Sequence, residues 1–89
     1  MEEFIIAVFS SRTQVTYFNK VLTTAGIKSE IISTPREILI GCGLSVKFPK
    51  QNMEAVGQIY NDLMPSSFVG FYFVEYNNFR YRVISKIGN

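Results

Sequence analysis

The sequence contains no histidine and only one cysteine among its 89 residues. Histidine is the commonest general base in enzymes and the commonest metal ligand, so its absence removes the usual source of both roles. A Ser–His–Asp triad or a Cys–His pair cannot be assembled within this chain, and one cysteine is too few ligands for the usual zinc sites. We therefore expect neither a metal nor another cofactor, and a carrier or binding protein rather than a stand-alone enzyme.

A single cysteine also excludes an internal disulfide, which indicates a reducing compartment. The chain opens with Met1-Glu2-Glu3, and this start is acidic where a secretory signal is basic. The apolar run at residues 4–9 is far too short to cross a bilayer. These features predict a cytoplasmic protein without a membrane segment.

Nine basic and seven acidic residues give a net charge of +2, which is too balanced to indicate a nucleic-acid or membrane-surface partner by itself. Tryptophan is absent, but eight phenylalanines and five tyrosines supply enough aromatic volume for a core. The hydrophobic fraction of 47% argues against disorder. At this length we expect a single domain over residues 1–89.

The first 26 residues predict a buried strand followed by a helix. Residues 4–9 are apolar and rich in β-branched side chains, as in a central strand. Ser11 followed by Gln14 has the form of a capping box, and Gly26 is a natural helix end. Periodicity and turn residues then predict strands at 29–33, 44–48, 69–76 and 79–87 and a second helix at 53–63.

The order strand, helix, strand, strand, helix, strand predicts a ferredoxin-like βαββαβ sandwich of the α+β class. We expect an antiparallel sheet with both helices on one face and the last strand added at the edge. The opposite face is expected to be apolar enough to form a homodimer, because large exposed apolar surfaces usually bind partners. Its candidate residues are Tyr72, Val74, Tyr76, Phe79 and Tyr81.

Asn77 and Asn78 predict a two-residue hairpin turn between the last two strands, because asparagine tolerates the left-handed conformations that such turns require. This turn would place Tyr76 opposite Phe79. One step further from the turn, Glu75 would face Arg80 as a cross-strand ion pair.

The one reactive group that the sequence offers is the thiol of Cys42. In the predicted fold the first strand ends at the sheet edge where the third begins, which places Cys42 near Ser10, Ser11 and the start of the first helix. The unpaired N–H groups at a helix N-terminus stabilise a thiolate. Arg12 and Arg36 could add positive charge there. The alternative is that Cys42 is a small core residue without chemistry.

Gly41 and Gly43 bracket the thiol. Glycines leave the sulfur unshielded and allow unusual backbone dihedrals, so that a partner could approach closely. They could equally serve a tight turn alone. Arg36 could likewise be a solvated loop charge or pair with the neighbouring Glu37.

A family resemblance rests on the segments Thr34-Pro35-Arg36-Glu37 and Cys42-Gly43-Leu44, after a first strand that ends in Phe9-Ser10. Together they resemble the selenium/sulfur carrier protein-like family, over roughly residues 4–75. The resemblance implies that Cys42 holds sulfur or selenium as a persulfide or perselenide. It also implies that Arg36 and Glu37 are the motif's charged pair, that Gly43 is its neighbouring glycine, and that donor and acceptor proteins exchange the cargo.

Two other functions stay open at this point. The chain could be a protein-interaction or regulatory module without chemistry, because ferredoxin-like domains host many functions. Residues 70–76 also resemble the aromatic motif of RNA-recognition modules. That motif belongs on the strand before the second helix, whereas this segment follows it, which argues against nucleic acid as a partner.

Overall fold

Five strands form one antiparallel sheet in the computed structural model, which describes residues 2–88. The sheet order is β2-β3-β1-β4-β5. The α+β class and an antiparallel sheet with two helices are therefore as predicted. The strands are β1 (Glu2–Phe9), β2 (Glu30–Ser33), β3 (Leu44–Phe48), β4 (Phe68–Asn77) and β5 (Arg80–Ile87).

Strand β1 is the centre of the sheet, because it pairs with β3 on one side and β4 on the other. Its residues from Phe4 to Phe9 are all buried. A strand that is covered on both faces has no solvent side to fill with polar residues, which explains the continuous apolar run in the sequence.

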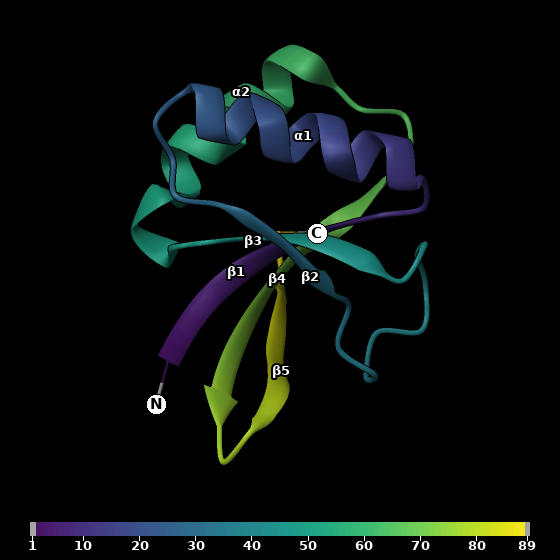
Figure 1. Ribbon diagram of the computed structural model, residues 1–89, viewed down its shortest axis with the longest axis vertical. Helices are drawn as coiled ribbons and strands as arrows, with labels where there is room; N and C mark the ends of the chain where they lie inside the picture. Colours follow the sequence, from purple (N-terminus) through teal and green to yellow (C-terminus); the bar gives the residue numbers. More distant parts are fainter. Residues whose placement is uncertain (1, 89) are drawn as a thin grey trace.

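Both helices cover the same face of the sheet (Figure 1). Helix α1 spans Arg12–Thr24, and α2 spans Met53–Leu63 after a short 3-10 turn, η1, at Lys50–Asn52. The hydroxyl of Ser11 accepts a hydrogen bond from the backbone N–H of Gln14 at 3.4 Å, which is one half of the predicted capping box. Neither helix of the described chain has the length and apolar character needed to cross a membrane.

The sheet separates two hydrophobic cores. The helix-side core lies between sheet and helices and includes Phe9, Phe18 and Phe48. The second, which we call the loop-side core, lies on the opposite face. Its buried members are Phe4, Ile6, Val8 and Val74.

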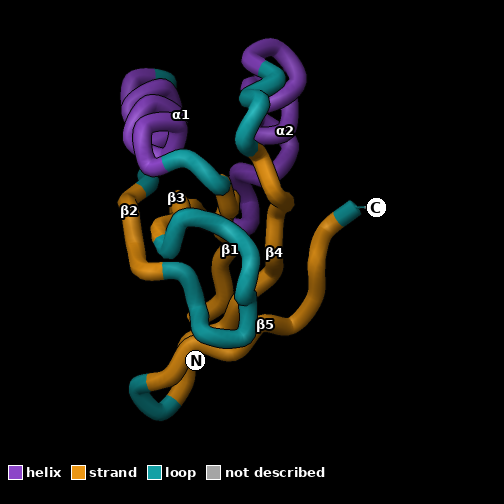
Figure 2. Tube along the Cα trace, turned by 90° about the vertical axis from the view of Figure 1, so that its right-hand side faces the viewer, coloured by secondary structure: helices purple, strands orange, loops and turns teal. Residues whose placement is uncertain are grey.

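The loop between β2 and β3 covers part of the loop-side core. Figure 2 shows this loop running past the sheet on the side away from the helices. Ile38 packs against the loop-side core, and a carboxylate oxygen of Glu37 accepts a hydrogen bond from the N–H of Val83 in β5 at 2.8 Å. The loop thereby connects β2, the outer strand on one side of the sheet, to β5, the outer strand on the other side.

The predicted register of the last hairpin is wrong by two residues. The turn is Asn78–Phe79, with φ of 53° and 63°, and Tyr76 faces Tyr81. Glu75 accordingly pairs with Arg82, at 3.8 Å between Nη1 and Oε1, and not with Arg80. A shift of two residues leaves every side chain on the same face, so the alternation of the sequence fits both registers.

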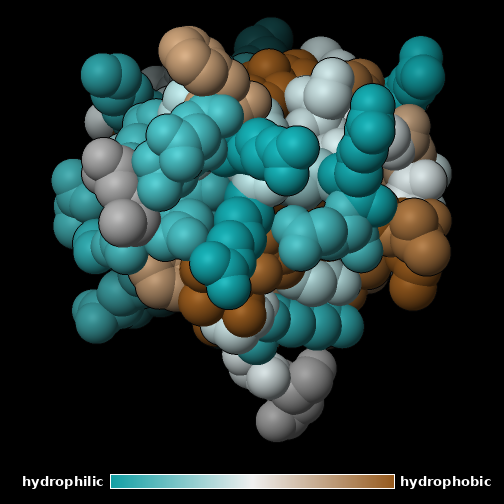
Figure 3. Space-filling model, turned by 90° about the horizontal axis from the view of Figure 1, so that it is seen from below, coloured by the Kyte–Doolittle hydropathy of each residue, from teal (hydrophilic) through white to brown (hydrophobic). Residues whose placement is uncertain are grey.

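The apolar face that the sequence predicts is partly covered in the fold, although Tyr81 and Phe79 are exposed. Val74 is buried and Tyr72 and Tyr76 are half-buried, while the ring of Tyr81 packs edge-on against Phe4 with 5.6 Å between centroids. Phe79, by contrast, is 94% exposed. Figure 3, viewed from below, shows mostly hydrophilic side chains with separate apolar patches. The homodimer stays a prediction, with less apolar surface to support it.

Ser45 is fully buried in β3, and its hydroxyl lies 2.6 Å from the hydroxyl of Thr34. Thr34→Val removes the partner and leaves a buried hydroxyl unsatisfied. We expect the free energy of unfolding to fall by about 1–3 kcal/mol in urea denaturation. The double variant Thr34→Val/Ser45→Ala removes both polar groups and should recover much of that loss. Equal stability of the single and double variants would contradict this assignment.

Candidate functional site

The backbone of Cys42 is attached to the end of β1. Its N–H donates a hydrogen bond to the carbonyl oxygen of Phe9 at 2.9 Å. Phe9 is the last residue of β1, and Ser10 and Ser11 lead from it into α1. The structure therefore brings the backbone of Cys42 to the end of the central strand β1, from which the chain enters α1.

The thiol itself is half-buried and packs against the helix-side core. Its S–H donates to the carbonyl oxygen of Leu44, with 3.7 Å between Sγ and the oxygen. The sulfur thus combines features of both interpretations that the sequence left open, because it contacts the core and still reaches solvent.

The serines at the start of α1 bind other groups. The N–H of Ser10 donates to the carbonyl of Ser67 at 2.8 Å, and the Ser10 hydroxyl approaches the same oxygen at 3.3 Å. Ser11 caps the helix, and Arg12 is exposed in its first turn. Among residues 2–88, no hydrogen bond or ion pair joins these three side chains to the thiol.

A polar cluster that the sequence analysis missed ties α1 to the segment before β4. The side-chain amide of Gln14 donates to the hydroxyl of Ser66 at 3.1 Å. Its carbonyl oxygen accepts from the backbone N–H of Ser67 at 3.0 Å and also from the Ser67 hydroxyl. Gln14 therefore holds the start of α1 to this segment instead of bonding back to Ser11 to close the capping box. Its partners lie more than 50 residues away in the sequence.

The two glycines serve the geometry of the loop. Gly41 and Gly43 have φ of 121° and 89°, which side-chain-bearing residues rarely adopt. A Cβ on Gly41 would lie 3.0 Å from both the carbonyl oxygen of Phe9 and Cγ1 of Val8. Gly41 thus allows the loop to press onto β1 immediately before Cys42.

The remaining motif residues lie toward the other end of the loop. The N–H of Thr34 donates to the carbonyl of Gly43 at 2.9 Å and closes the loop, and Pro35 is buried just inside it. Glu37 binds the N–H of Val83, so its carboxylate contacts β5 and forms no ion pair with Arg36 among the described residues. Arg36 is exposed and lines a groove shared with the β4–β5 hairpin.

Two exposed aliphatic residues stand directly before the glycine–cysteine pair. Leu39 is 92% exposed and Ile40 is 66% exposed. They lie between two anchored residues, Ile38 in the loop-side core and Gly41 against β1. The sequence signal for them is an apolar triplet inside a predicted loop, which is unusual for a segment that should face water.

The aromatic motif on β4 has one of its rings, that of Phe71, inside the protein. Phe71 is 8% exposed and its ring packs against Phe48, Tyr60 and Phe68, with centroid distances of 6.1, 5.7 and 4.8 Å. A ring held in the helix-side core cannot stack on a base. Within residues 2–88, no group of three or more cysteine, aspartate or glutamate side chains could hold a metal ion.

Gly41→Ala tests the close approach of the loop to β1. Because the added methyl would meet the backbone of β1 and alanine disfavours the positive φ that this position requires, we expect the free energy of unfolding to fall by roughly 1–3 kcal/mol. Gly57→Ala in α2 is the matched control, since its Cβ would meet only Cε of Met53 at 3.9 Å. That change should raise stability by about 0.5–1 kcal/mol in the same urea titration. Loss of stability in both variants, or in neither, would speak against this role of Gly41.

Comparison with known proteins gives one match. The family model described as "Putative Se/S carrier protein-like" matches residues 4–63, which run from β1 to the end of α2 and include Cys42. A search of the curated proteins and a search of the solved structures returned no match. Because the matched region covers well over half of the chain, the protein belongs to the Se/S carrier protein-like family.

Proposed function

We propose that the protein carries a sulfur or selenium atom on Cys42, as a persulfide or perselenide. The observation that supports this most is the attachment of Cys42 to the end of β1, which holds the only thiol of the chain at a defined edge of the sheet. The family match, which includes this residue, agrees with such a role.

The transfer needs no oxidant or reductant beyond the two exchanging thiols. The thiolate of Cys42 attacks the outer sulfur of a donor persulfide, R–S–SH. A new S–S bond forms at Cys42, the S–S bond of the donor breaks, and the donor leaves as a thiolate. An acceptor thiolate then attacks the outer sulfur on Cys42 and restores the Cys42 thiolate. With selenium, the outer atom is selenium and the bond changes are the same.

The surroundings of Cys42 suit an exchange between proteins better than hydrolysis. The sequence has no histidine that could act as a general base. Gly41 and Gly43 add no side chains beside the sulfur, so a donor or acceptor can approach closely. Leu39 and Ile40, which precede Cys42 by three and two residues, present exposed aliphatic side chains that a protein partner could bury.

The ferredoxin-like class belongs to the same proposal. It is supported by the order of helices and strands along the chain and by the position of β1 between β3 and β4. A binding module without chemistry is the competing function, and the exposure of Leu39 and Ile40 would serve it equally well. The two differ only in what Cys42 does.

Incubation with glutathione persulfide, or with a cysteine desulfurase and cysteine, tests the proposal. We expect the wild-type protein to gain the mass of one sulfur atom at Cys42, and dithiothreitol to remove it, because a persulfide is a reducible sulfur–sulfur bond. Intact-mass and peptide mass spectrometry measure both steps.

Cys42→Ser is the matched control, since it keeps the size of the side chain and removes the sulfur. It should fold and gain no mass. The carrier function is excluded if the folded wild-type protein gains no sulfur from either donor while its thiol reacts with iodoacetamide only in denaturant.

A further inference from the structure

A groove of about 790 Å³ lies between the β2–β3 loop and the β4–β5 hairpin. Its lining includes Arg36 from the loop and Asn77, Asn78, Phe79 and Arg80 from the hairpin. The volume falls within the range of small-ligand sites. Nothing in the carrier proposal uses this groove.

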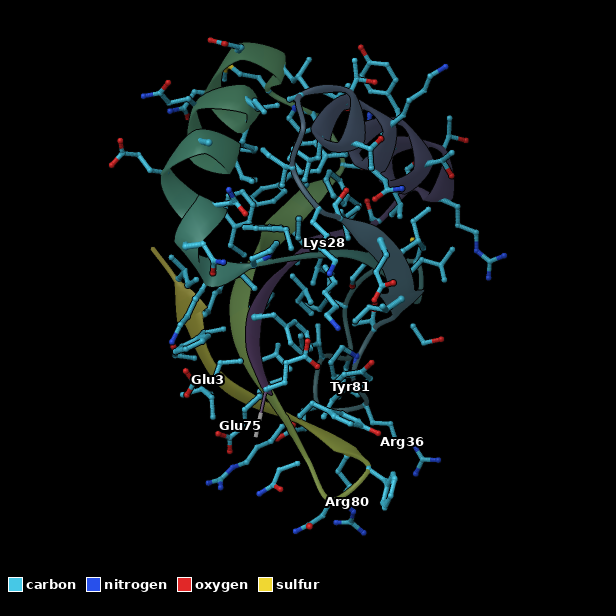
Figure 4. All side chains as sticks on the ribbon, turned by 60° about the vertical axis from the view of Figure 1, so that its left-hand side comes forward. Glu3, Lys28, Arg36, Glu75, Arg80 and Tyr81 are labelled. Atoms are coloured by element: carbon cyan, nitrogen blue, oxygen red, sulfur yellow. The ribbon has the colours of Figure 1, made fainter. Side chains whose placement is uncertain are left out.

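The groove is lined by three arginines, Arg36, Arg80 and Arg82, and by two carboxylates, Glu37 and Glu75, so its charged side chains have a positive balance. Its two carboxylates are engaged, since Glu75 pairs with Arg82 at 3.8 Å and Glu37 accepts the N–H of Val83 at 2.8 Å. Arg36 and Arg80 are exposed and have no ion-pair partner among residues 2–88. Figure 4 shows both of them at the end of the molecule away from the helices, in the same region as Tyr81.

Phe79 occupies the tip of the hairpin in a conformation that does not favour a bulky residue. Its φ is 63°, in the left-handed region where glycine or asparagine is preferred. It is also 94% exposed, so its ring contributes almost nothing to either core. Residues held in such sparsely populated conformations cluster at functional sites.

We propose that this groove binds a nucleoside phosphate, with the base stacked on Phe79 and phosphate oxygens on Arg36 and Arg80. Guanidinium groups bind phosphates and carboxylates alike. The unpartnered ring favours a flat base over an acidic peptide, because every base offers a face for stacking. The amides of Asn77 and Asn78 can donate to and accept from a base edge.

Of the aromatic motif at residues 70–76, only Glu75 lines the groove, and the exposed ring of Phe79 lies outside that motif. A free nucleotide and a single strand present the same chemistry. The experiment below distinguishes these two ligands, and it measures binding independently of any chemistry at Cys42.

Fluorescence anisotropy with a labelled oligouridylate, and competition by UMP, tests the proposal at low salt. We expect Phe79→Gly to weaken binding about tenfold, the scale of one lost base stack. The same variant should unfold at a higher temperature, because glycine suits the turn, so weaker binding cannot be attributed to misfolding. Arg36→Gln and Arg80→Gln should each weaken binding and reduce the log–log salt slope by about 0.7.

Arg12→Gln is the matched control, an exposed arginine at the start of α1 outside the groove, and should bind as the wild type does. Full competition by UMP supports a free nucleotide as ligand, whereas binding of the oligonucleotide alone supports a single strand. The proposal is overturned if neither probe binds, if Phe79→Gly binds as well as the wild type, or if Arg12→Gln weakens binding equally. Equal competition by oligoglutamate or tripolyphosphate would also overturn it, because neither contains a base.

Discussion

The burial of β1 on both faces is the constraint on which the rest of the structure depends. Its six consecutive buried residues contribute alternately to the helix-side core and the loop-side core. Each buried aliphatic or aromatic side chain of this kind stabilises the fold by roughly 1.5–3 kcal/mol relative to exposure. Because β3 and β4 pair with this one strand, both halves of the chain are aligned on it.

The position of the thiol follows from the same strand. The carbonyl of Phe9 accepts the N–H of Cys42, and the backbone beside it meets Gly41. A loop of this length would otherwise sample many conformations, and it gives up that freedom only where contacts compensate. The anchors at Ile38, Glu37 and Gly41 supply those contacts and leave Leu39 and Ile40 facing outward.

The two proposed activities use opposite ends of this single loop. Its C-terminal end holds Cys42 against β1, where the proposed cargo is exchanged. Its N-terminal end carries Arg36 toward the β4–β5 hairpin, where the groove lies. The hydrogen bond from the N–H of Val83 to the carboxylate of Glu37 holds that end of the loop to β5, so the geometry of the groove depends on this contact.

Much of the architecture was predictable because it depends on local patterns. The apolar run of β1 and the periodicity of both helices reflect which side of each segment meets water or core. The cap at Ser11 depends only on residues within one helical turn. The backbone bond of Cys42 to the end of β1 agrees with the expected pairing of β1 with β3, whereas the closeness of its thiol to the start of the first helix stays a prediction. The motif around Cys42 also led to the family whose model matches residues 4–63.

What the sequence could not decide were choices between arrangements that satisfy the same pattern. Two hairpin registers differ by two residues and present identical faces, and the pairing of Val74 with Val83 and of Tyr76 with Tyr81 accompanies only one of them. Glu37 could have paired with Arg36, yet it binds an amide 46 residues away because the loop folds beneath the sheet. Composition and spacing determined which elements form and in what order. The register, the partner of Glu37 and the partial burial of the thiol came from contacts between segments distant in sequence, which exist only once the sheet is assembled.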